Sequence, residues 1–321
     1  MDAQVGPYSQ LRDRYEDALE LLDDVLAMFS AQPVEPAMSR LVSGLCEVKS
    51  KLDPADWRAF RSDWMHHPLA RIVHQDPLTS WAYRKPWGYP GDARLLDFIY
   101  REPCIAADLS AASELGRAIY AFTSDLAAMR AIRERRGYVT RFVDQIAHER
   151  GRPISVLALA AGQLREAEQS RALAAGEIAR WVALDQDAEM LAHIADAFPG
   201  SAVRPVGGSV RGMIAGRYEL GTFDVIYAAG LYDHLSESLA RRLTEVAFGM
   251  LNPGGELLVT NFARGIRDAG YIESFMDWRL LLRDESEMEE VWSGLPEPTV
   301  AARRLFADPQ RNILYGLVQR S

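Results

Sequence analysis

Hydrophobic residues follow two different periods along this chain, and the change falls near residue 150. Up to that point apolar residues recur every three or four positions between acids and arginines, which is the spacing of the buried face of a helix. This spacing predicts two helices at the start of the chain, with apolar faces formed by Leu11, Tyr15, Leu19, Leu22, Leu26 and Phe29 and by Met38, Leu41, Val42, Leu45, Val48 and Leu52.

Further helices are predicted in the same part of the chain. Asp53 followed by Pro54 is typical of a helix N-cap and first turn, and Trp57, Phe60 and Trp64 would lie on the buried face of that helix. A segment rich in proline, glycine and aromatic residues predicts a loop over about 76–92. Helices follow over about 92–101 and 110–149, the second either continuous or broken near Gly137.

After residue 153 the pattern alternates between strand and helix, which predicts a mostly parallel sheet with helices on both faces. The predicted strands are Ser155–Ala161, Arg180–Asp185, Ala202–Val206, Phe223–Ala229, Glu256–Asn261, Arg304–Ala307 and Ile313–Gln319. The predicted helices are 164–175, 187–197, 209–215, 236–251 and 272–292. The last two strands follow one another without a helix, so they should be antiparallel. We expect a helical lid or substrate domain over 1–150 and an α/β, Rossmann-like domain over 151–321.

Composition narrows the function classes. The 321 residues carry a net charge of −9 with a pI near 5.3, and a nucleic-acid groove needs a basic surface instead. Arg130, Arg133, Arg135 and Arg136 form a local basic cluster, which we interpret as the solvated end of a helix. Two cysteines imply no disulfide framework and favour a reducing cytoplasm. No apolar run reaches membrane-spanning length, the acidic N-terminus is not typical of a signal peptide, and His66, His67 and His74 lack neighbouring metal ligands.

The ends of the first four predicted strands should form a ligand pocket, because such sheets bind ligands outside the carboxyl ends of their strands. Asp185 ends the second strand, where an acid can accept hydrogen bonds from both ribose hydroxyls; alternatively it caps the next helix, a role open to Asp187 as well. The turn at Gly208 could present backbone N–H groups to an adenine, or be an ordinary glycine turn. The candidate cofactor-binding residues are Ala160, Ala161, Gly162, Asp185, Gln186, Gly208, Ser209, Val210, Ala229 and Gly230.

Four segments together resemble the class I S-adenosylmethionine-dependent methyltransferases over about residues 150–320: Val156–Gly162, Ala183–Asp185, Phe223–Gly230 and Leu251–Leu258. The resemblance implies a seven-stranded sheet with an antiparallel last strand and S-adenosylmethionine as cofactor. The sequence departs from the family pattern at three positions. Ala158 replaces an acid, and Ala160 and Leu164 replace glycines. Ala160 is acceptable if the turn needs no positive φ there. Arg165 could pair with the carboxylate of the cofactor, and Glu166 could hold its amino-acid end, or both could lie on a solvated helix face.

A narrower resemblance covers nearly the whole chain. Lys85–Tyr100, Ala229–Leu235 and Thr260–Phe262 are similar to a bacterial group of 3-hydroxypalmitate methyl ester biosynthesis and to the azetidine-2-carboxylate synthases, which cyclise the methionine part of S-adenosylmethionine. Its most specific marker is Gly88-Tyr89-Pro90-Gly91-Asp92. We expect Tyr89 and Asp92 to reach over the pocket from the lid, unless Asp92 only caps the helix that follows it.

The other candidates for catalysis are polar side chains near the ends of the fourth and fifth strands. Tyr232 could face the sulfonium, Asp233 or His234 could take a proton or cap a helix, and Asn261 could orient a substrate. Tyr271 and Glu273 follow in a segment of aromatics and acids that would wall the pocket, whereas Phe275 and Trp278 are expected in the core.

Three functions remain open at this point. The first is methyl transfer from S-adenosylmethionine to a small acceptor in specialised metabolism. The second is cyclisation, in which the methionine amine displaces methylthioadenosine from its own γ-carbon; the missing acid at Ala158 and the large lid favour it slightly. The third is a binding module without catalysis, against which the acid at Asp185 argues. The sequence does not specify the acceptor or the oligomeric state.

Overall fold

The computed structural model describes residues 15–89 and 91–321, so the predicted contribution of Leu11 to the first helix and the residue Pro90 of the loop marker lie outside the described residues. The chain divides into two compact units. Unit 1 consists of Met1–Arg130 with Ile266–Arg279, and unit 2 of Ala131–Gly265 with Leu280–Ser321. This division differs from one at residue 150, because most of the helix α10 (Ala127–Arg150) belongs to unit 2 and a short later segment belongs to unit 1.

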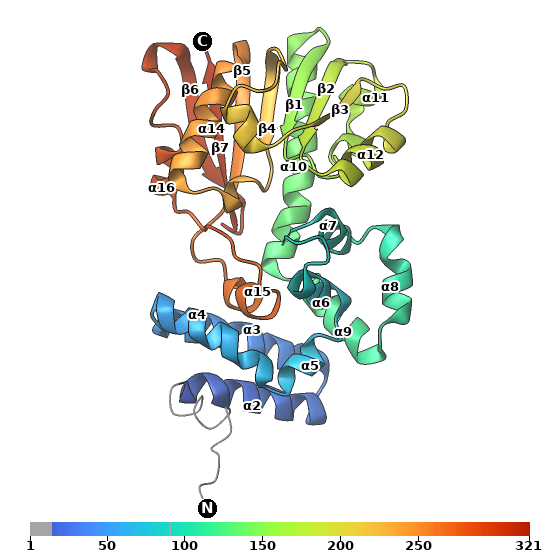
Figure 1. Ribbon diagram of the computed structural model, residues 1–321, viewed down its shortest axis with the longest axis vertical. Helices are drawn as coiled ribbons and strands as arrows, with labels where there is room; N and C mark the ends of the chain where they lie inside the picture. The colour runs from blue at the N-terminus through green and yellow to red at the C-terminus, as the bar shows by residue number, and fades with distance from the viewer. Residues whose placement is uncertain (1–14, 90) are drawn as a thin grey trace, which may run out of the picture. The chain divides into compact units, whose positions relative to one another are not determined.

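Unit 1 is helical, as the spacing of its apolar residues predicts (Figure 1). Its α-helices are α2 (Glu16–Ala31), α3 (Val34–Lys51), α4 (Pro54–Asp63), α5 (Leu69–Val73), α6 (Pro77–Arg84), α7 (Ala93–Tyr100), α8 (Ala106–Ala111), α9 (Glu114–Thr123), the start of α10, and α15 (Ala269–Phe275), with single 3₁₀ turns at Trp64–His66 and Pro103–Ile105. The predicted cap at Asp53 is confirmed, since its carboxylate accepts hydrogen bonds from the backbone N–H groups of Ala55 and Asp56.

The predicted loop over 76–92 is wrong in its first half, where α6 forms. Asp76 caps α6 by accepting hydrogen bonds from the N–H groups of Leu78 and Thr79 at 3.0 Å each, and Pro77 occupies the first turn. This is the same Asp-Pro signal that marks α4, but the aromatic and glycine content of the segment obscured it.

The predicted helix over 110–149 is three helices instead of one. The chain breaks before α9, where the Ser113 hydroxyl caps the helix by accepting a hydrogen bond from Gly116 N at 2.9 Å, and again before α10. Gly137 lies inside α10, which continues through it. At the first break a capping residue, rather than the glycine, therefore sets the start of the new helix.

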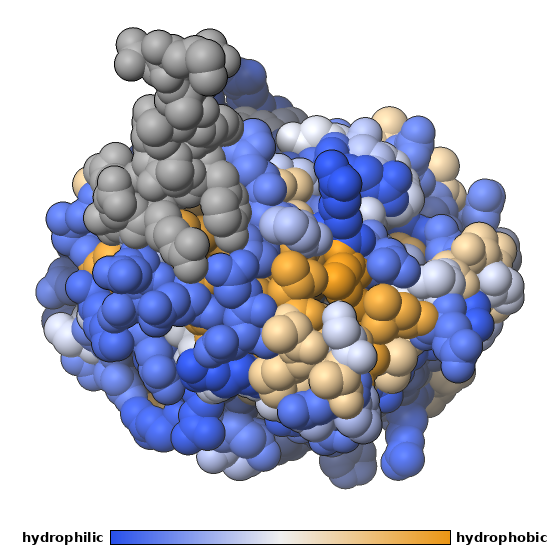
Figure 2. Space-filling view, turned by 90° about the horizontal axis from the view of Figure 1, so that it is seen from below, coloured by the Kyte–Doolittle hydropathy of each residue, from blue (hydrophilic) through white to orange (hydrophobic). Residues whose placement is uncertain are grey.

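Within unit 1, α15 packs directly on α3. A methyl group at Gly270 of α15 would lie 2.7 Å from the carbonyl carbon of Leu45, so only glycine permits this approach of the two backbones. Figure 2 shows the face of unit 1 around its first helices: hydrophilic residues cover most of it, and the largest group of hydrophobic residues forms a patch near its centre.

Among the described residues, the strands of unit 2 form one seven-stranded sheet in the order β3-β2-β1-β4-β5-β7-β6 (Figure 1). The first five strands are parallel, and β7 runs antiparallel to both of its neighbours. All seven predicted strands are confirmed: β1 (Ile154–Leu159), β2 (Ile178–Asp185), β3 (Val203–Gly207), β4 (Phe223–Ala228), β5 (Leu251–Phe262), β6 (Val300–Ala307) and β7 (Ile313–Arg320).

Two of the helices predicted after residue 153 are shorter than the sequence pattern indicates. Only a 3₁₀ turn (Ala167–Gln169) and α11 (Arg171–Ala174) form in the predicted helix 164–175, and within 272–292 the chain unwinds between α15 and α16 (Glu285–Glu290). The other helices are α12 (Ala188–Ala197), α13 (Val210–Ile214) and α14 (Glu237–Gly249), with 3₁₀ turns at Tyr232–His234 and Glu297–Thr299.

The strands are buried because one set of alternating side chains, including Leu157, Val182 and Ile226, packs in one hydrophobic cluster with residues of α14 and α16. The neighbours of β1 are β2 on one side and β4 on the other, so the order of strands reverses there. A crevice for a ligand is expected at such a reversal, outside the carboxyl ends of the strands.

Candidate functional site

The turn after β1 and the end of β2 are joined by hydrogen bonds. Gly162 N donates to Asp185 Oδ2 at 2.8 Å, and Ala161 N donates to the carbonyl oxygen of Leu184 at 3.1 Å. Ala160 has φ of +52° and Gly162 of +54°, so the turn does require a left-handed residue at Ala160, contrary to the condition under which alanine would be unstrained there. The family pattern places glycine at this position, and this chain accepts the strain.

Asp185 is half-buried and its two carboxylate oxygens have different partners. Oδ2 accepts from Gly162 N, Oδ1 accepts from Asp187 N at 2.9 Å, and the backbone of Gln186 also bonds the carboxylate. Burial raises the pKa of the Asp185 carboxyl, while the hydrogen bonds from Asp187 and Gly162 oppose that rise. The cap of α12 is Asp187, whose carboxylate accepts from two N–H groups of that helix. The alternative that Asp185 is the cap is therefore excluded; Gln186, between the two acids, is exposed.

The polar groups of the turn after β3 bond within the protein. Gly208 N donates to the Asp185 carbonyl oxygen at 2.8 Å, and Ser209 N donates to the Tyr218 hydroxyl at 2.9 Å. The Ser209 hydroxyl caps α13, which begins at Val210, by accepting from Gly212 N at 3.1 Å. The predicted presentation of N–H groups to an adenine would require Ser209 to exchange its partner.

Tyr232 lies in the hydrophobic core, not at the edge of the sheet. After β4, Ala229 and Gly230 are partly exposed, and Gly230 has φ of +94° before the chain enters the 3₁₀ turn of Tyr232–His234. This turn directs the fully buried Tyr232 ring toward α14, where its hydroxyl bonds Thr244 Oγ1 at 2.8 Å. Burial raises the pKa of Tyr232 well above its ordinary value. In this arrangement its ring and hydroxyl face α14, not the strand ends where the ligand is expected.

Asp233 and His234 differ in burial although they are adjacent. Asp233 is buried, its Oδ1 accepts from Phe262 N at 2.6 Å, and its carbonyl oxygen accepts from Leu281 N at 2.8 Å. Burial raises the pKa of the Asp233 carboxyl, and the positive charge of Arg135 opposes this. His234 has an exposed surface, but burial of its imidazole lowers the pKa of that ring, which the charge of Asp233 opposes. Asp233 therefore links the ends of β4 and β5, while His234 is only partly enclosed.

The Asn261 side chain is fully used by the protein. Its Nδ2 donates to the carbonyl oxygens of Phe262 and Leu281 at 2.9 and 2.8 Å, and its Oδ1 accepts from Arg283 Nη1. Arg283, which the sequence analysis did not single out, also donates to the carbonyl oxygens of Tyr232 at 2.8 Å and Leu235 at 2.6 Å. The pair fixes the segment after β5 against the turn after β4, so Asn261 has a positioning contact in place of a free amide.

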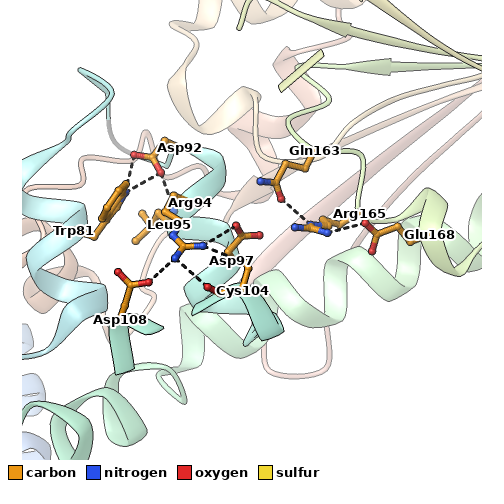
Figure 3. A network of polar contacts seen from close by, with 10 residues as sticks. All are labelled: Trp81, Asp92, Arg94, Leu95, Asp97, Cys104, Asp108, Gln163, Arg165 and Glu168. Carbon is orange, nitrogen blue, oxygen red and sulfur yellow. Dashed lines mark hydrogen bonds and ion pairs between the residues drawn. The ribbon is translucent and has the colours of Figure 1, made fainter. Parts of the chain in front are cut away.

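Two charged residues follow the β1 turn. Arg165 donates to Gln163 Oε1 at 2.7 Å and to Glu168 Oε1 at 2.8 Å, as Figure 3 shows. Glu166 accepts from the Tyr227 hydroxyl at 2.5 Å, and its pKa is raised by burial, which the Tyr227 hydrogen bond and Arg135 oppose. Neither residue lies on a solvated helix face.

Arg135 of α10 is buried, with 5% of its surface exposed, which corrects the interpretation of the basic cluster as solvated. Its Nη1 lies 3.8 Å from Asp233 Oδ2 and its guanidinium carbon 5.9 Å from the centre of the Phe262 ring. A helical signal could have found it, because Arg135 lies three residues after Ile132 and four before Val139, both buried.

The remaining predicted residues belong to unit 1. Asp92 is the N-cap of α7, where it accepts from Leu95 N at 2.8 Å, and it also accepts from Trp81 Nε1 at 3.0 Å (Figure 3). Tyr89 is partly exposed. Tyr271 is fully buried, and its hydroxyl bonds Thr79 Oγ1 at 2.8 Å.

Glu273, predicted to contact a ligand, is bonded within unit 1. Its carboxylate accepts from Trp57 Nε1 at 2.6 Å and pairs with Lys49 Nζ at 2.5 Å. Phe275 and Trp278 are buried, as predicted. In the described part of the chain, no group of three or more His, Cys, Asp and Glu side chains is placed to hold a metal ion. None of the described helices is both long and apolar enough to cross a membrane.

Comparison with solved structures finds similar chains at low sequence identity. A possible exported protein from Bordetella parapertussis is similar over 99% of both chains, with a TM-score of 0.54 and 15% identity. A magnesium protoporphyrin IX methyltransferase from Synechocystis, with bound S-adenosylmethionine, covers 61% of this chain and 84% of its own with a TM-score of 0.42 and 13% identity. An N-methyltransferase from Bradyrhizobium japonicum, in complex with S-adenosylhomocysteine, covers 70% and 99% with a TM-score of 0.43 and 15% identity.

The sheet order decides the fold class. An order of β3-β2-β1-β4-β5-β7-β6, with β7 antiparallel and a helical region before the sheet, is that of the class I methyltransferase fold. No family model and no curated protein sequence matches the chain. Fold alone does not assign an activity, which depends on the site.

Proposed function

We propose that unit 2 binds S-adenosylmethionine at the carboxyl edge of its sheet and that the protein is an S-adenosylmethionine-dependent transferase acting on a small molecule. The observation that carries the proposal is the link between Asp185 and Gly162, at the point where the strand order reverses. A carboxylate that three backbone N–H groups orient there can also accept hydrogen bonds from a ribose.

The proposed reaction is methyl transfer to a small acceptor. The sulfonium supplies an activated carbon, so the protein has to position the acceptor, exclude water and, for a protonated nucleophile, accept a proton. His234 is the residue best suited to accept it, because it follows the end of β4 and burial lowers the pKa of its imidazole, which favours the neutral form; Tyr232 and Asn261 are bonded within the protein. That Tyr89, Asp92 and Tyr271 take part in the reaction stays a prediction.

Cyclisation is the second candidate, and one observation favours it. Ala158 is fully buried in β1, where the family pattern has an acid, so no carboxylate from β1 holds the ammonium of the methionine. In cyclisation the amine nitrogen forms a bond to the γ-carbon of the same molecule while the bond from that carbon to sulfur breaks, and the sulfur keeps the electron pair. The products are methylthioadenosine and azetidine-2-carboxylate, and the amine proton passes to a base.

Incubation with S-adenosylmethionine alone separates the two reactions. Methyl transfer predicts no turnover until an acceptor is added, after which S-adenosylhomocysteine accumulates. Cyclisation predicts methylthioadenosine without any acceptor, at a rate proportional to protein. Asp185→Ala serves as the control, because it removes the proposed ribose contact and should slow either reaction. If the protein does not bind the nucleoside at all, the proposed function is wrong.

A further inference from the structure

One buried cation in unit 2 lacks the partners that its burial requires. Arg135 Nη1 is buried and makes no hydrogen bond among the described residues. The nearest acid, Asp233, is 3.8 Å away, too far for a hydrogen bond, and its other oxygen already accepts from Phe262 N. A buried donor with no acceptor is costly, and more so when it belongs to a charged group.

The position of Arg135 places this donor at the candidate site. Its guanidinium lies beside Gly230, after β4, and near the ring of Phe262, the last residue of β5. A methyl group at position 230 would lie 2.8 Å from Arg135 Nη2, so the glycine leaves room for the guanidinium. Arg135 therefore lies at the carboxyl ends of two parallel strands, the edge where such sheets bind ligands.

The groups around Arg135 indicate which anion it would bind. Its charge acts on the carboxyls of Asp233 and Glu166, so one cation and two acids lie within electrostatic reach of one another. A guanidinium binds a carboxylate through two parallel N–H donors, and nearby acids attract an ammonium. An α-amino acid offers both groups close together, because its carboxylate and its ammonium are attached to the same carbon.

We propose that Arg135 binds the carboxylate of an α-amino acid at the carboxyl edge of the unit 2 sheet. The carboxylate can come from two molecules, the methionine end of S-adenosylmethionine or a separate amino-acid acceptor. For the first of these, the inference rests on the proposed function. Arg165, the residue that the sequence favoured for this role, already donates to Gln163 and Glu168.

The test compares two nucleosides that differ only at the amino-acid end. S-adenosylhomocysteine carries it, and 5′-methylthioadenosine has the same adenosine and sulfur without it. Calorimetric titration of the full chain gives both affinities for the wild type, Arg135→Gln and Arg135→Lys. We expect Arg135→Gln to weaken S-adenosylhomocysteine about 10- to 100-fold, the worth of a charge-assisted hydrogen-bond pair, and methylthioadenosine less than about twofold. Arg135→Lys should fall in between.

Two other arginines serve as controls. Arg141→Gln changes an exposed arginine on the same helix and should alter neither affinity. Arg165→Gln should also leave the ratio of the two affinities unchanged, whereas a selective loss of S-adenosylhomocysteine in this variant alone would transfer the role to Arg165 and overturn the proposal.

A second measurement covers the acceptor as the source. Thermal unfolding is recorded with saturating S-adenosylhomocysteine and added glycine, L-serine or L-glutamate. Stabilisation by one of these in the wild type and its loss in Arg135→Gln, with unchanged nucleoside affinities, assigns the carboxylate to the acceptor and supports the proposal. The proposal fails if Arg135→Gln weakens both nucleosides equally, or if it changes neither the affinity ratio nor the response to amino acids.

Failure of the proposed function gives a different result. In that case the wild type binds neither nucleoside, and the amino acids are tested on the protein alone. Stabilisation that requires Arg135 would then keep the amino-acid site without the nucleoside, and its absence would refute both proposals.

Discussion

Exchange of Asp185 for asparagine tests the central contact of the site with almost no change in shape. In the native protein one carboxylate oxygen accepts from Gly162 N at 2.8 Å and the other from Asp187 N at 2.9 Å. An asparagine has one acceptor oxygen, so its amide nitrogen, itself a donor, must face one of these N–H groups. The side chain of residue 185 can then accept a hydrogen bond from the turn after β1 or from the segment before α12, but not from both.

Two opposing terms set the size of the effect on stability. Loss of one hydrogen bond to a charged group costs about 1.5–3 kcal/mol. Part of this is recovered, because burial raises the pKa of Asp185 and removal of the charge relieves that desolvation. We therefore expect Asp185→Asn to lower the free energy of unfolding by about 1–2 kcal/mol. If the carboxylate also accepts from ribose, the affinity for methylthioadenosine should fall about 10- to 100-fold.

Asp187→Asn is the matched control, two residues along the chain. Asp187 caps α12, and asparagine is as good an N-cap as aspartate, so we expect changes below about 0.5 kcal/mol and no loss of affinity. Urea denaturation followed by circular dichroism gives the stabilities, and calorimetry gives the affinities. Equal effects of the two substitutions, or an Asp185→Asn protein that binds the nucleoside as tightly as the wild type, would refute the ribose contact.

Three further predictions concern single positions. Ala160→Gly should raise the free energy of unfolding by about 1 kcal/mol, because alanine is strained at φ of +52°. The control Ala158→Gly in β1 should lower it. If urea denaturation shows that both variants are less stable than the wild type, the strain at Ala160 is refuted. Burial raises the folded-state pKa of Asp76 from 3.8 to about 6, so its contribution to the free energy of unfolding is fully present below about pH 4 and is lost as the pH rises through 6, by up to about 3 kcal/mol. Asp76→Asn should therefore remove this decrease from the free energy of unfolding measured against pH. If the decrease is the same in the variant, other groups cause it. Asp92→Ala should destabilise the protein by about 1–2 kcal/mol because it removes the α7 cap, whereas Asp92→Asn should retain the cap. If Asp92→Asn loses turnover but not stability, Asp92 has a role in the reaction.

The sheet could be predicted from the sequence because buried parallel strands are continuous apolar segments of limited length. All seven strands lie where the pattern places them, and Asp185 ends β2 as expected. The helices were predicted less well. In α6 the Asp76-Pro77 cap outweighs a composition typical of loops, and in α10 the chain tolerates Gly137 within a helix.

The directions of the side chains at the strand ends could not be predicted. Tyr232 follows β4 directly, but the positive φ of Gly230 and the 3₁₀ turn direct its ring into the core. Asn261 ends up bonded to a segment 20 residues later in the chain, a contact that no local pattern encodes. Arg135 differs from the expectation for another reason: a cluster of arginines is typical of a solvated surface, but the spacing of Arg135 from Ile132 and Val139 places it on the buried face of α10.

A crystal structure of the protein grown with S-adenosylhomocysteine tests the account most directly. The account predicts electron density for the nucleoside at the carboxyl edge of the unit 2 sheet, with both ribose hydroxyls within hydrogen-bond distance of the Asp185 carboxylate. Density for the nucleoside at another surface, or at this edge with the ribose turned away from Asp185, would contradict it.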